Sequence, residues 1–336
     1  MSDPLVVIDA DVLGQQRTGD ETYVENLLRA LPAVGEGLRF AAITRRPELV
    51  PPGVEPIALP ARSQELRMAV RVPLLLRRLR PALAHFVHAL PLVLTCPAVL
   101  TIQDLSFERD ASLMGARETA IFRFVVPRSA RRARAVLAIS ERTKDDLVRL
   151  YGLPAGKVTV TPLAPDPAFR PGGTRKDYVL LSGSIEARKN PLLAAEAAAA
   201  AGRRLVVAGP ERDRALASAL RARGADVRGF VTKEELVRLT QEAAVLLFPT
   251  RHEGFGLPVV EAMACGTPVV ATPDAAVREA GGDAVAYAEP RAFASTLERV
   301  LADPGPWSRA GIERARSMTW ERTATATVGV YRAALA

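Results

Sequence analysis

The sequence predicts an α/β fold with two doubly wound parallel sheets, one in each half of the chain. Short apolar runs alternate with segments of helical periodicity, and this alternation restarts after a proline-rich passage at 162–173. The 336 residues, 49% hydrophobic and 24% charged, also suit about two globular domains. Such sheets bind ligands at the carboxyl ends of their strands, so two of these Rossmann-like domains facing each other would form a deep cleft.

In the first half, the apolar runs predict the strands of one domain. They lie at 5–8, 40–44, 82–87, 98–102, 135–139 and 158–160, with a helix at 21–31 and a basic helix before 135. Residues 81–102 carry no formal charge and are long enough to span a membrane. Three prolines interrupt this stretch, and we expect two buried strands joined by a loop instead.

The second half repeats the alternation, and the proline-rich passage is the predicted linker between the halves. Strands are expected at 178–182, 205–208, 227–229, 245–248 and 268–271. Helices are expected at 191–201, 216–223, 234–243 and 258–264, with a long last helix from about Trp320. We therefore place the two domains at 1–170 and 171–318, with the helix at about 319–336 crossing back to the first.

Charge and cysteine content narrow the function classes. The 45 Lys and Arg residues exceed the 37 Asp and Glu residues by 8, but the excess is spread out and no nucleic-acid-binding motif accompanies it. We therefore expect no nucleic-acid partner. Cys96 and Cys265 do not suggest a disulfide framework, and the N-terminus lacks the pattern of a signal peptide. A cytoplasmic protein is the expectation.

Two arginine-rich stretches, 77–80 and 128–134, have apolar neighbours. Solvated helix faces explain them most simply. The alternative is peripheral contact with an anionic membrane, at the inner membrane face, or with a lipid-phosphate acceptor.

The segment 248–268 is the most informative for function. A predicted strand ends before a loop that carries Glu253 and two glycines, and a helix starts near Pro258. Glycine lets backbone N–H groups approach a ligand closely, and a helix N-terminus favours an anion such as a diphosphate. Glu261 follows one turn into the helix, so both carboxylates can reach one cleft. A capped helix with two surface glutamates is the structural alternative.

A second segment has the features of a diphosphate site. A predicted strand ends at Gly183, and Arg188 and Lys189 precede Asn190 and Pro191. Asn at the N-cap and Pro at the first position start a helix. Two cations beside a helix N-terminus can bind a diphosphate, although an exposed basic pair would look the same in sequence.

These two segments resemble motifs of a known family. Glu253-Gly-Phe-Gly-Leu-Pro-Val-Val-Glu261, followed by Ala-Met-Ala-Cys-Gly-Thr-Pro, resembles the E-x7-E donor-site motif of the family-four retaining glycosyltransferases, GT-B enzymes that use nucleotide sugars. Further segments resemble the family's glycine loop, its T-x-H-D-L-S-F segment, the end of its first domain, its phosphate segment and its crossing last helix. They are 18–28, 101–107, 138–141 with 162–171, 181–191, and 320–322 with 330–331.

The resemblance implies roles for individual residues. Arg188 and Lys189 would hold the donor diphosphate, Glu253 would contact the sugar hydroxyls, and Glu261 would accept hydrogen bonds from the ribose. The implied catalytic residues are Glu253, Arg188, Lys189 and Gln103. The implied donor-binding residues are Gly19, Gly183, Gly254, Phe255, Gly256, Leu257 and Glu261.

The chain departs from the family pattern at two places. Gln103 stands where the family usually has His before its Asp-Leu pair; Gln can donate a hydrogen bond but cannot take up a proton. The substitution therefore bears on rate and donor choice more than on activity itself. Asp20 and Glu21 place carboxylates at the start of the first helix, where they would repel a diphosphate. We expect them to bind acceptor hydroxyls or an amine.

Other polar residues carry weaker signals. Asp9 and Asp11 resemble a metal-binding pair, but no other carboxylates lie near them in sequence, and we expect no metal. His85 and His88 are expected to be structural, and His252 lies near the donor motif by position only.

The resemblance as a whole implies a metal-independent hexosyltransferase without a cofactor. GDP-mannose is the first expectation for the donor and UDP-glucose the next, with a hydroxyl of a glycan, a lipid-linked molecule or a small molecule as acceptor. The first domain would bind the acceptor and the second the nucleotide sugar. Two alternatives remain: a catalytically weak homologue that acts as a binding or regulatory subunit, and a nucleotide-sugar epimerase of the same architecture.

Overall fold

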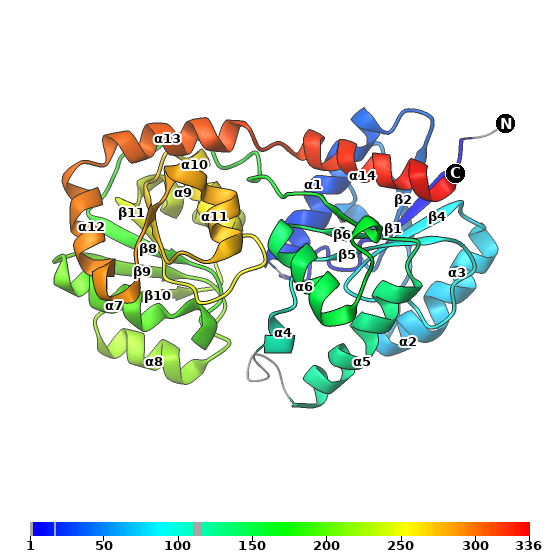
Figure 1. The fold of residues 1–336 in the computed structure, drawn as a ribbon, viewed down its shortest axis with the longest axis horizontal. Coiled ribbons are helices and arrows are strands. Elements are labelled where there is room, and N and C mark those ends of the chain that lie inside the picture. The colour runs from blue at the N-terminus through cyan, green and yellow to red at the C-terminus, as the bar shows by residue number, and fades with distance from the viewer. Residues whose placement is uncertain (1–2, 17, 110–115) are drawn as a thin grey trace. The chain divides into compact units, whose positions relative to one another are not determined.

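The computed structural model describes residues 3–16, 18–109 and 116–336 (Figure 1). The chain divides into two units. Unit 1 comprises Met1–Leu163 and Thr319–Ala336, and unit 2 comprises Ala164–Met318. The division at 163 falls inside the proline-rich passage, a few residues before the boundary at 170 expected from the sequence.

Unit 1 contains a fully parallel sheet with the strand order β3-β2-β1-β4-β5-β6-β7 among the described residues. The strands are β1 (Leu5–Asp9), β2 (Arg39–Thr44), β3 (Glu55–Ala58), β4 (Leu83–Val87), β5 (Ala98–Ile102), β6 (Ala135–Ala138) and β7 (Val158–Val160). The strand order reverses between β1 and β4, which pair directly, Val7 opposite Ala84. Ligands of doubly wound sheets bind outside the carboxyl ends at such a reversal.

Helices cover both faces of this sheet. The helices of unit 1 are α1 (Thr18–Val34), α2 (Gln64–Leu66), a π-helical turn (Arg67–Arg71), α3 (Val72–Leu79), α4 (Ser106–Arg109), α5 (Ala116–Arg132), α6 (Glu141–Tyr151) and α14 (Trp320–Leu335). Right-handed crossovers place α3, α5 and α6 on one face and α1 on the other. Figure 1 shows α14 packed along α1, on the face opposite α3 and α5.

Unit 2 has a second fully parallel sheet, ordered β10-β9-β8-β11-β12-β13 in the described part of the chain. Its strands are β8 (Tyr178–Ser182), β9 (Arg204–Ala208), β10 (Asp226–Gly229), β11 (Val245–Phe248), β12 (Val269–Ala271) and β13 (Ala286–Tyr287). Its helices are α7 (Pro191–Ala200), α8 (Arg214–Ala222), α9 (Lys233–Glu242), α10 (Leu257–Ala264), α11 (Ala275–Gly281), α12 (Phe293–Ala302) and α13 (Gly305–Arg316). Here the order reverses between β8 and β11.

The predicted fold class is confirmed: both sheets are parallel and doubly wound. The long buried strands lie where their apolar runs placed them, and 81–102 forms two strands around a loop, whereas the short strand β13 was not expected. In the described part of the chain, no helix has the length and apolar character needed to span a bilayer.

Two features of unit 1 differ from the expectation. The first helix begins at Thr18 rather than 21, so Gly19 lies inside its first turn. The edge strand β3 was not expected, because its sequence Glu-Pro-Ile-Ala is mostly exposed and contains a proline.

A buried chain of hydrogen bonds joins four elements of unit 1. Tyr23 of α1 and His85 of β4 both bond the Thr101 hydroxyl of β5, at 2.8 and 2.7 Å. The His85 Nδ1 atom lies 2.6 Å from the Tyr331 hydroxyl of α14. Since His85 is 1% exposed, burial lowers its pKa to about 3. The predicted structural role of His85 is confirmed, and the neutral ring helps to attach the last helix.

This network predicts a pH-dependent stability. The pKa of His85 is lower in the folded protein than the ordinary 6.5. The neutral ring therefore contributes fully to the unfolding free energy above pH 6.5, and this contribution is lost as the pH falls toward 3. Between pH 7.5 and 5.0, we expect wild type to lose about 2 kcal/mol more of unfolding free energy than the His85→Gln variant. Urea unfolding at both pH values measures this, and parallel losses in the two proteins would contradict it.

Candidate active site

The strongest candidate site lies in unit 2, at the reversal of its strand order. The loop after β8 carries Gly183 and the basic pair, and the loop after β11 carries Glu253. Because β8 and β11 pair in parallel, their carboxyl ends are adjacent, and the two loops meet although they are far apart in sequence.

The loop after β8 is shaped by backbone that only small residues allow. Gly183 has a φ of 124°, and a Cβ atom added to Gly209 would lie 2.0 Å from the Gly183 carbonyl oxygen. A short 3-10 turn, Ala187–Lys189, then precedes α7. Asn190 occupies the N-cap position expected for it, but in a left-handed conformation and without a side-chain capping bond.

A buried cluster of charges joins the two loops. The Lys189 Nζ atom lies 2.5 Å from the Glu253 Oε1 atom, and an Arg188 Nη1 atom lies 3.1 Å from the same oxygen. The Thr250 hydroxyl also donates to this oxygen, at 2.8 Å. Glu253 and Lys189 are only 7% and 8% exposed. Two cations and one carboxylate therefore form one compact group, with Glu186 as a second carboxylate on Arg188 at 2.8 Å.

The electrostatics of this cluster favour an ionised Glu253. Burial by itself raises the pKa of a carboxyl, but the charges of Lys189 and Arg188 and the hydrogen bonds from Lys189 and Thr250 outweigh it. They lower the pKa of Glu253 to about 2. For Lys189 burial lowers the pKa, and the Glu253 charge opposes this effect. An incoming anion would find cations held in place by a charged partner.

The helix α10 adds a second anion-favouring feature beside this cluster. Gly256 precedes it with a φ of 104°, in the left-handed region that favours glycine, and offers no side-chain cap to the first turn. Phe255 is buried, and Leu257 begins the helix, within one residue of the predicted start. The N–H groups at this helix start can therefore serve a ligand, since a phosphate is stabilised there.

Glu261 lies one turn into α10 in a different environment. It is 8% exposed, and burial together with the nearby charge of Asp166 raises its pKa to about 8, against the opposing charge of Lys233. Asp166 and Lys233 form an ion pair at 2.8 Å. Sequence reasoning missed both residues, because Asp166 lies in the proline-rich passage and no motif connects it to Lys233.

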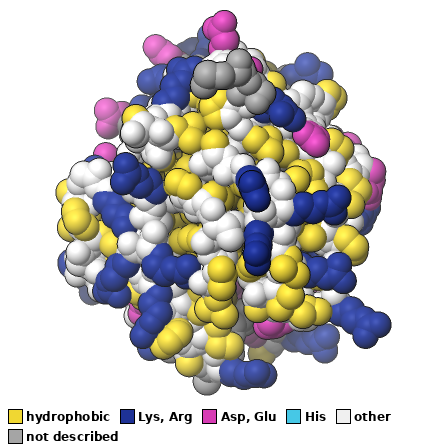
Figure 2. All heavy atoms as spheres, turned by 90° about the vertical axis from the view of Figure 1, so that its right-hand side faces the viewer, with side chains coloured by type: hydrophobic (Ala, Val, Ile, Leu, Met, Phe, Trp, Pro, Cys, Tyr) yellow, Lys and Arg dark blue, Asp and Glu magenta, His cyan; other side chains and the backbone are white. Residues whose placement is uncertain are grey.

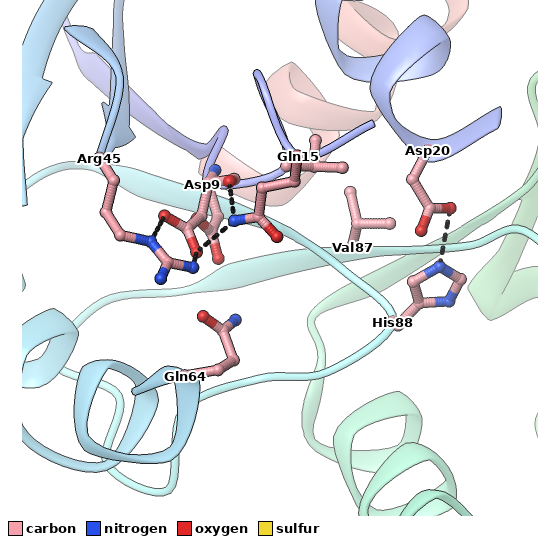
Figure 3. Close-up of a pocket in the computed structure, with 9 residues that line it drawn as sticks. Asp9, Gln15, Asp20, Arg45, Gln64, Val87 and His88 are labelled. Carbon is pink, nitrogen blue, oxygen red and sulfur yellow. Dashed lines mark hydrogen bonds and ion pairs between the residues drawn. The ribbon is translucent and has the colours of Figure 1, made fainter. Parts of the chain in front are cut away.

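Unit 1 has its own pocket at the reversal of its strand order (Figure 3). It lies between the loop after β1 and the end of β4, and has a volume of about 100 Å³. Its walls are mainly polar. The lining residues are Asp9, Asp11, Val12, Gln15, Asp20, Arg45, Gln64, Val87 and His88.

Two arginines pair with the aspartates at the end of β1 and just after it. Arg67, fully buried, pairs with Asp9 at 2.5 Å, and Arg45 pairs with Asp11 in a two-pronged contact at 2.8 and 2.5 Å. Burial of Asp11 acts to raise its pKa, but these arginines and Gln15 lower it overall. Asp9 and Asp11, which resemble a metal-binding pair in sequence, are thus the partners of two arginines in the structure. No cluster of three or more His, Cys, Asp or Glu able to hold a metal occurs among the described residues.

The carboxylates expected at the first helix separate in space. The Asp20 Oδ1 atom lies 3.1 Å from the His88 Nε2 atom at the pocket wall, as the dashed line in Figure 3 marks. Glu21 instead accepts a hydrogen bond from the Gly14 N–H at 2.6 Å and does not line the pocket. His88 has a φ of 65°, a left-handed conformation uncommon outside glycine. Such strain is often found at functional sites.

Gln103 follows β5 and is 8% exposed. Its Nε2 atom has no hydrogen-bond partner in the described structure, whereas its backbone carbonyl accepts a bond from the Thr143 hydroxyl at 3.1 Å. A buried donor without a partner is costly, and such groups often mark functional positions.

Comparisons with known proteins bear on both units. A model described as Glycosyltransferase Family 4 matches residues 17–169, and one described as Glycosyl transferases group 1 matches residues 176–303. The O-antigen chain mannosyltransferase B of Escherichia coli is 28% identical over 60% of this chain and 61% of its own length. A D-inositol 3-phosphate glycosyltransferase of Kribbella flavida is 32% identical over 73% of this chain and 66% of its own length. The matched part of the chain thus spans less than two thirds of the length of these relatives.

Solved structures share the architecture of the whole chain. Sucrose-phosphate synthase from Thermosynechococcus elongatus has a TM-score of 0.79 at 18% identity and covers 98% of both chains. WaaG, described as a glycosyltransferase involved in lipopolysaccharide biosynthesis, has a TM-score of 0.70 at 17% identity over 97% of this chain and 99% of its own. At these identities the likeness concerns the fold, which is GT-B.

The buried cluster predicts a large loss of stability when its carboxylate is neutralised. Glu253→Gln leaves Lys189 and Arg188 without their shared charge, and we expect a loss of about 3–5 kcal/mol in unfolding free energy. Urea unfolding measures this. Glu211→Gln is the matched control, since Glu211 pairs with Arg221 at the surface and its loss should leave the midpoint nearly unchanged. Equal midpoints for the two variants would contradict the prediction.

Proposed function

This chain belongs to the family-four, group 1 glycosyltransferases, and we propose that it transfers a hexosyl group from a nucleotide sugar to an acceptor hydroxyl with retention at the anomeric carbon. The observation that carries the proposal is the Arg188–Lys189–Glu253 cluster beside the start of α10, in which Lys189 and Glu253 are buried. It combines cations and a helix N-terminus for a diphosphate with a carboxylate for sugar hydroxyls.

The proposed reaction uses these groups to stabilise the leaving diphosphate. The bond between the anomeric carbon and the diphosphate oxygen breaks, and the acceptor oxygen bonds to the same carbon on the same face. The acceptor proton passes to the departing diphosphate oxygen, so no protein base is required. Arg188, Lys189 and the N–H groups of α10 offset the charge that develops on the diphosphate, and this lowers the barrier without a metal ion.

The other predicted residues of unit 2 would contribute to binding of the nucleotide-sugar donor. Gly183, Gly254, Phe255, Gly256 and Leu257 would bring backbone close to the sugar and phosphates. Glu261 would accept hydrogen bonds from the two ribose hydroxyls, and its ionised form accepts them most strongly.

The donor sugar is proposed from relatives. GDP-mannose comes first, because the matched Escherichia coli protein is named a mannosyltransferase. UDP-glucose comes next: HepE of Anabaena, similar in fold at a TM-score of 0.67 and 14% identity over 98% of each chain, was solved in complex with UDP and glucose.

Unit 1 would supply the acceptor site and the remaining donor contacts. Its polar pocket offers carboxylate, amide and guanidinium groups, which suit an acceptor rich in hydroxyls. Of the two carboxylates expected there, Asp20 lines the pocket, whereas the Gly14 N–H engages Glu21. Gly19 and Gln103 would border the donor, and the unpartnered Gln103 Nε2 atom is a donor for a sugar hydroxyl.

A catalytically weak homologue acting as a binding or regulatory subunit is the second candidate, favoured by Gln103 in place of a residue that can carry a proton. One experiment separates the two functions. The protein is incubated with GDP-, UDP-, ADP- and dTDP-sugars, with EDTA or magnesium, and release of nucleoside diphosphate and the anomeric configuration of products are followed. Turnover with retention in EDTA supports the proposal, whereas nucleotide binding without turnover on any acceptor supports the subunit function.

Nucleotide affinity should depend on Arg188. Its substitution Arg188→Gln removes a charge-assisted contact to the diphosphate, and we expect the preferred nucleoside diphosphate to bind about 10–100-fold more weakly by calorimetry. Arg299→Gln, an exposed position on α12, is the control and should bind as wild type does. A donor site elsewhere would leave the affinity of Arg188→Gln unchanged.

Nucleotide affinity should also rise with pH through Glu261. Because its pKa is raised to about 8, the carboxyl is mostly protonated at pH 6.5 and mostly ionised at pH 8.5. If binding requires the ionised form, affinity increases about tenfold or more over this interval. In Glu261→Gln the increase should disappear. An identical pH profile in both proteins would show that Glu261 does not meet the ribose.

The acceptor site makes a separate kinetic prediction. Asp20→Asn removes a carboxylate from the wall of the unit 1 pocket, so the acceptor KM should rise about fivefold or more, while the affinity for the nucleotide stays unchanged. Glu25→Gln, on the same helix, is the matched control. If neither Asp20→Asn nor Glu21→Gln changes the acceptor KM, the acceptor binds elsewhere.

A further inference from the structure

One face of unit 1 carries apolar side chains that point into solvent. They come from three segments: the helical run α2–α3, the loop between β4 and β5, and α5. Leu92 is 74% exposed, Leu74 60% and Phe124 58%. We call this surface the arginine face; its apolar members are Leu66, Val70, Leu74, Leu92, Val93, Ile121 and Phe124.

The topology brings these three segments together. The crossovers that contain α3 and α5 run in the same direction along the sheet, so both helices cover the same side of it. The loop after β4 returns across this side to start β5, and its Leu90 and Leu94 pack in the same hydrophobic core as Leu76 and Val126 of the two helices. The exposed residues therefore share one surface.

Specific contacts hold the exposed residues in position. Arg132 of α5 donates hydrogen bonds to the carbonyl oxygens of Pro91 and Leu92, at 3.2 and 2.9 Å. The Arg128 guanidinium stacks over the Phe124 ring, 3.4 Å from its centroid. Hydrogen bonds from Arg132 therefore hold the backbone at Leu92 in place, and a cation, Arg128, lies directly beside Phe124.

The charge of this face is strongly positive. The exposed arginines of its helices are Arg71, Arg77, Arg78, Arg117, Arg123, Arg128, Arg131 and Arg132. They outnumber the carboxylates that the structure describes near them, which are Glu108, paired with Arg123, and the exposed Glu65 of α2, close to Arg117. Among the described residues, no carboxylate pairs with Arg77, Arg78 or Arg128. Figure 2 views the side of unit 1 on which α3 lies; Lys, Arg and hydrophobic side chains intermingle there, and acidic ones are few. Such a surface complements an anionic one.

We infer that the arginine face binds the surface of an anionic lipid bilayer. Isolated aliphatic and aromatic tips among guanidinium groups suit the boundary where lipid headgroups meet acyl chains, because the tips enter the apolar layer while the arginines contact phosphates. Electrostatic attraction to a nucleic acid would not explain the exposed Leu92, Val93 and Leu74. The inference does not depend on the donor site, which lies in unit 2.

Vesicle flotation tests it directly. The full chain is mixed with vesicles of phosphatidylcholine alone or of phosphatidylcholine with 40% phosphatidylglycerol, at low and high salt. We expect at least tenfold more protein bound to the anionic vesicles at low salt, and a decrease at high salt. Absence of a preference for anionic vesicles, or binding to duplex DNA or RNA with no vesicle binding, would overturn the inference.

Two variants separate the apolar and the charged contributions. Leu92→Ser/Phe124→Ser and Arg77→Gln/Arg78→Gln should each lower vesicle binding at least fivefold while the melting temperature stays close to wild type, because the side chains are exposed. The matched controls in unit 2 are Phe230→Ser, 45% exposed, and Arg291→Gln/Arg299→Gln. Equal losses in the controls would show that general charge or hydrophobicity, and not this face, governs binding.

Discussion

The parallel arrangement of every described strand is the constraint on which both candidate sites depend. In a parallel sheet all carboxyl ends lie at one edge, and where the strand order reverses, the loops after two central strands meet there. This brings Lys189 to Glu253 across 64 residues in unit 2, and Asp9 and Asp11 near His88 in unit 1. Different ligands can bind at these edges without a change of fold, because the loop residues determine which chemical groups the edge presents.

Both units place ion pairs at these edges, but the pairs differ in what they offer a ligand. In unit 1, Arg67 pairs with Asp9 and lies 3.5 Å from Asp11, and Arg45 pairs with Asp11, so two arginines balance two aspartates at a pocket wall that also carries Asp20. In unit 2, Lys189 and Arg188 share the Glu253 oxygen and Arg188 also pairs with Glu186, so the charges balance there too, but the uncapped start of α10 adds N–H donors that favour an anion. This difference underlies the proposed acceptor pocket in unit 1 and the proposed diphosphate site in unit 2.

Much of the fold and part of the site followed from local patterns. Apolar runs identified the buried strands, because burial on both faces demands continuous hydrophobic residues. The edge strand β3 was not predicted, because an exposed edge strand needs no continuous hydrophobic run. In the candidate site, Arg188, Lys189 and Glu253 were expected together and do contact one another. Asp166, beside Glu261, carried no local signal, and Glu21 was expected at the acceptor but binds the Gly14 N–H.

The sequence by itself determined the fold class, the positions of most buried strands and of several helices, and the residue types of the proposed diphosphate site, because periodicity and helix-start chemistry act over a few residues. Only the tertiary structure decided the ionisation of these groups and their partners. Two glutamates eight residues apart have pKa values of about 2 and about 8, since one meets two cations and the other lies near Asp166. Long-range packing sets such electrostatics, and no local pattern encodes it.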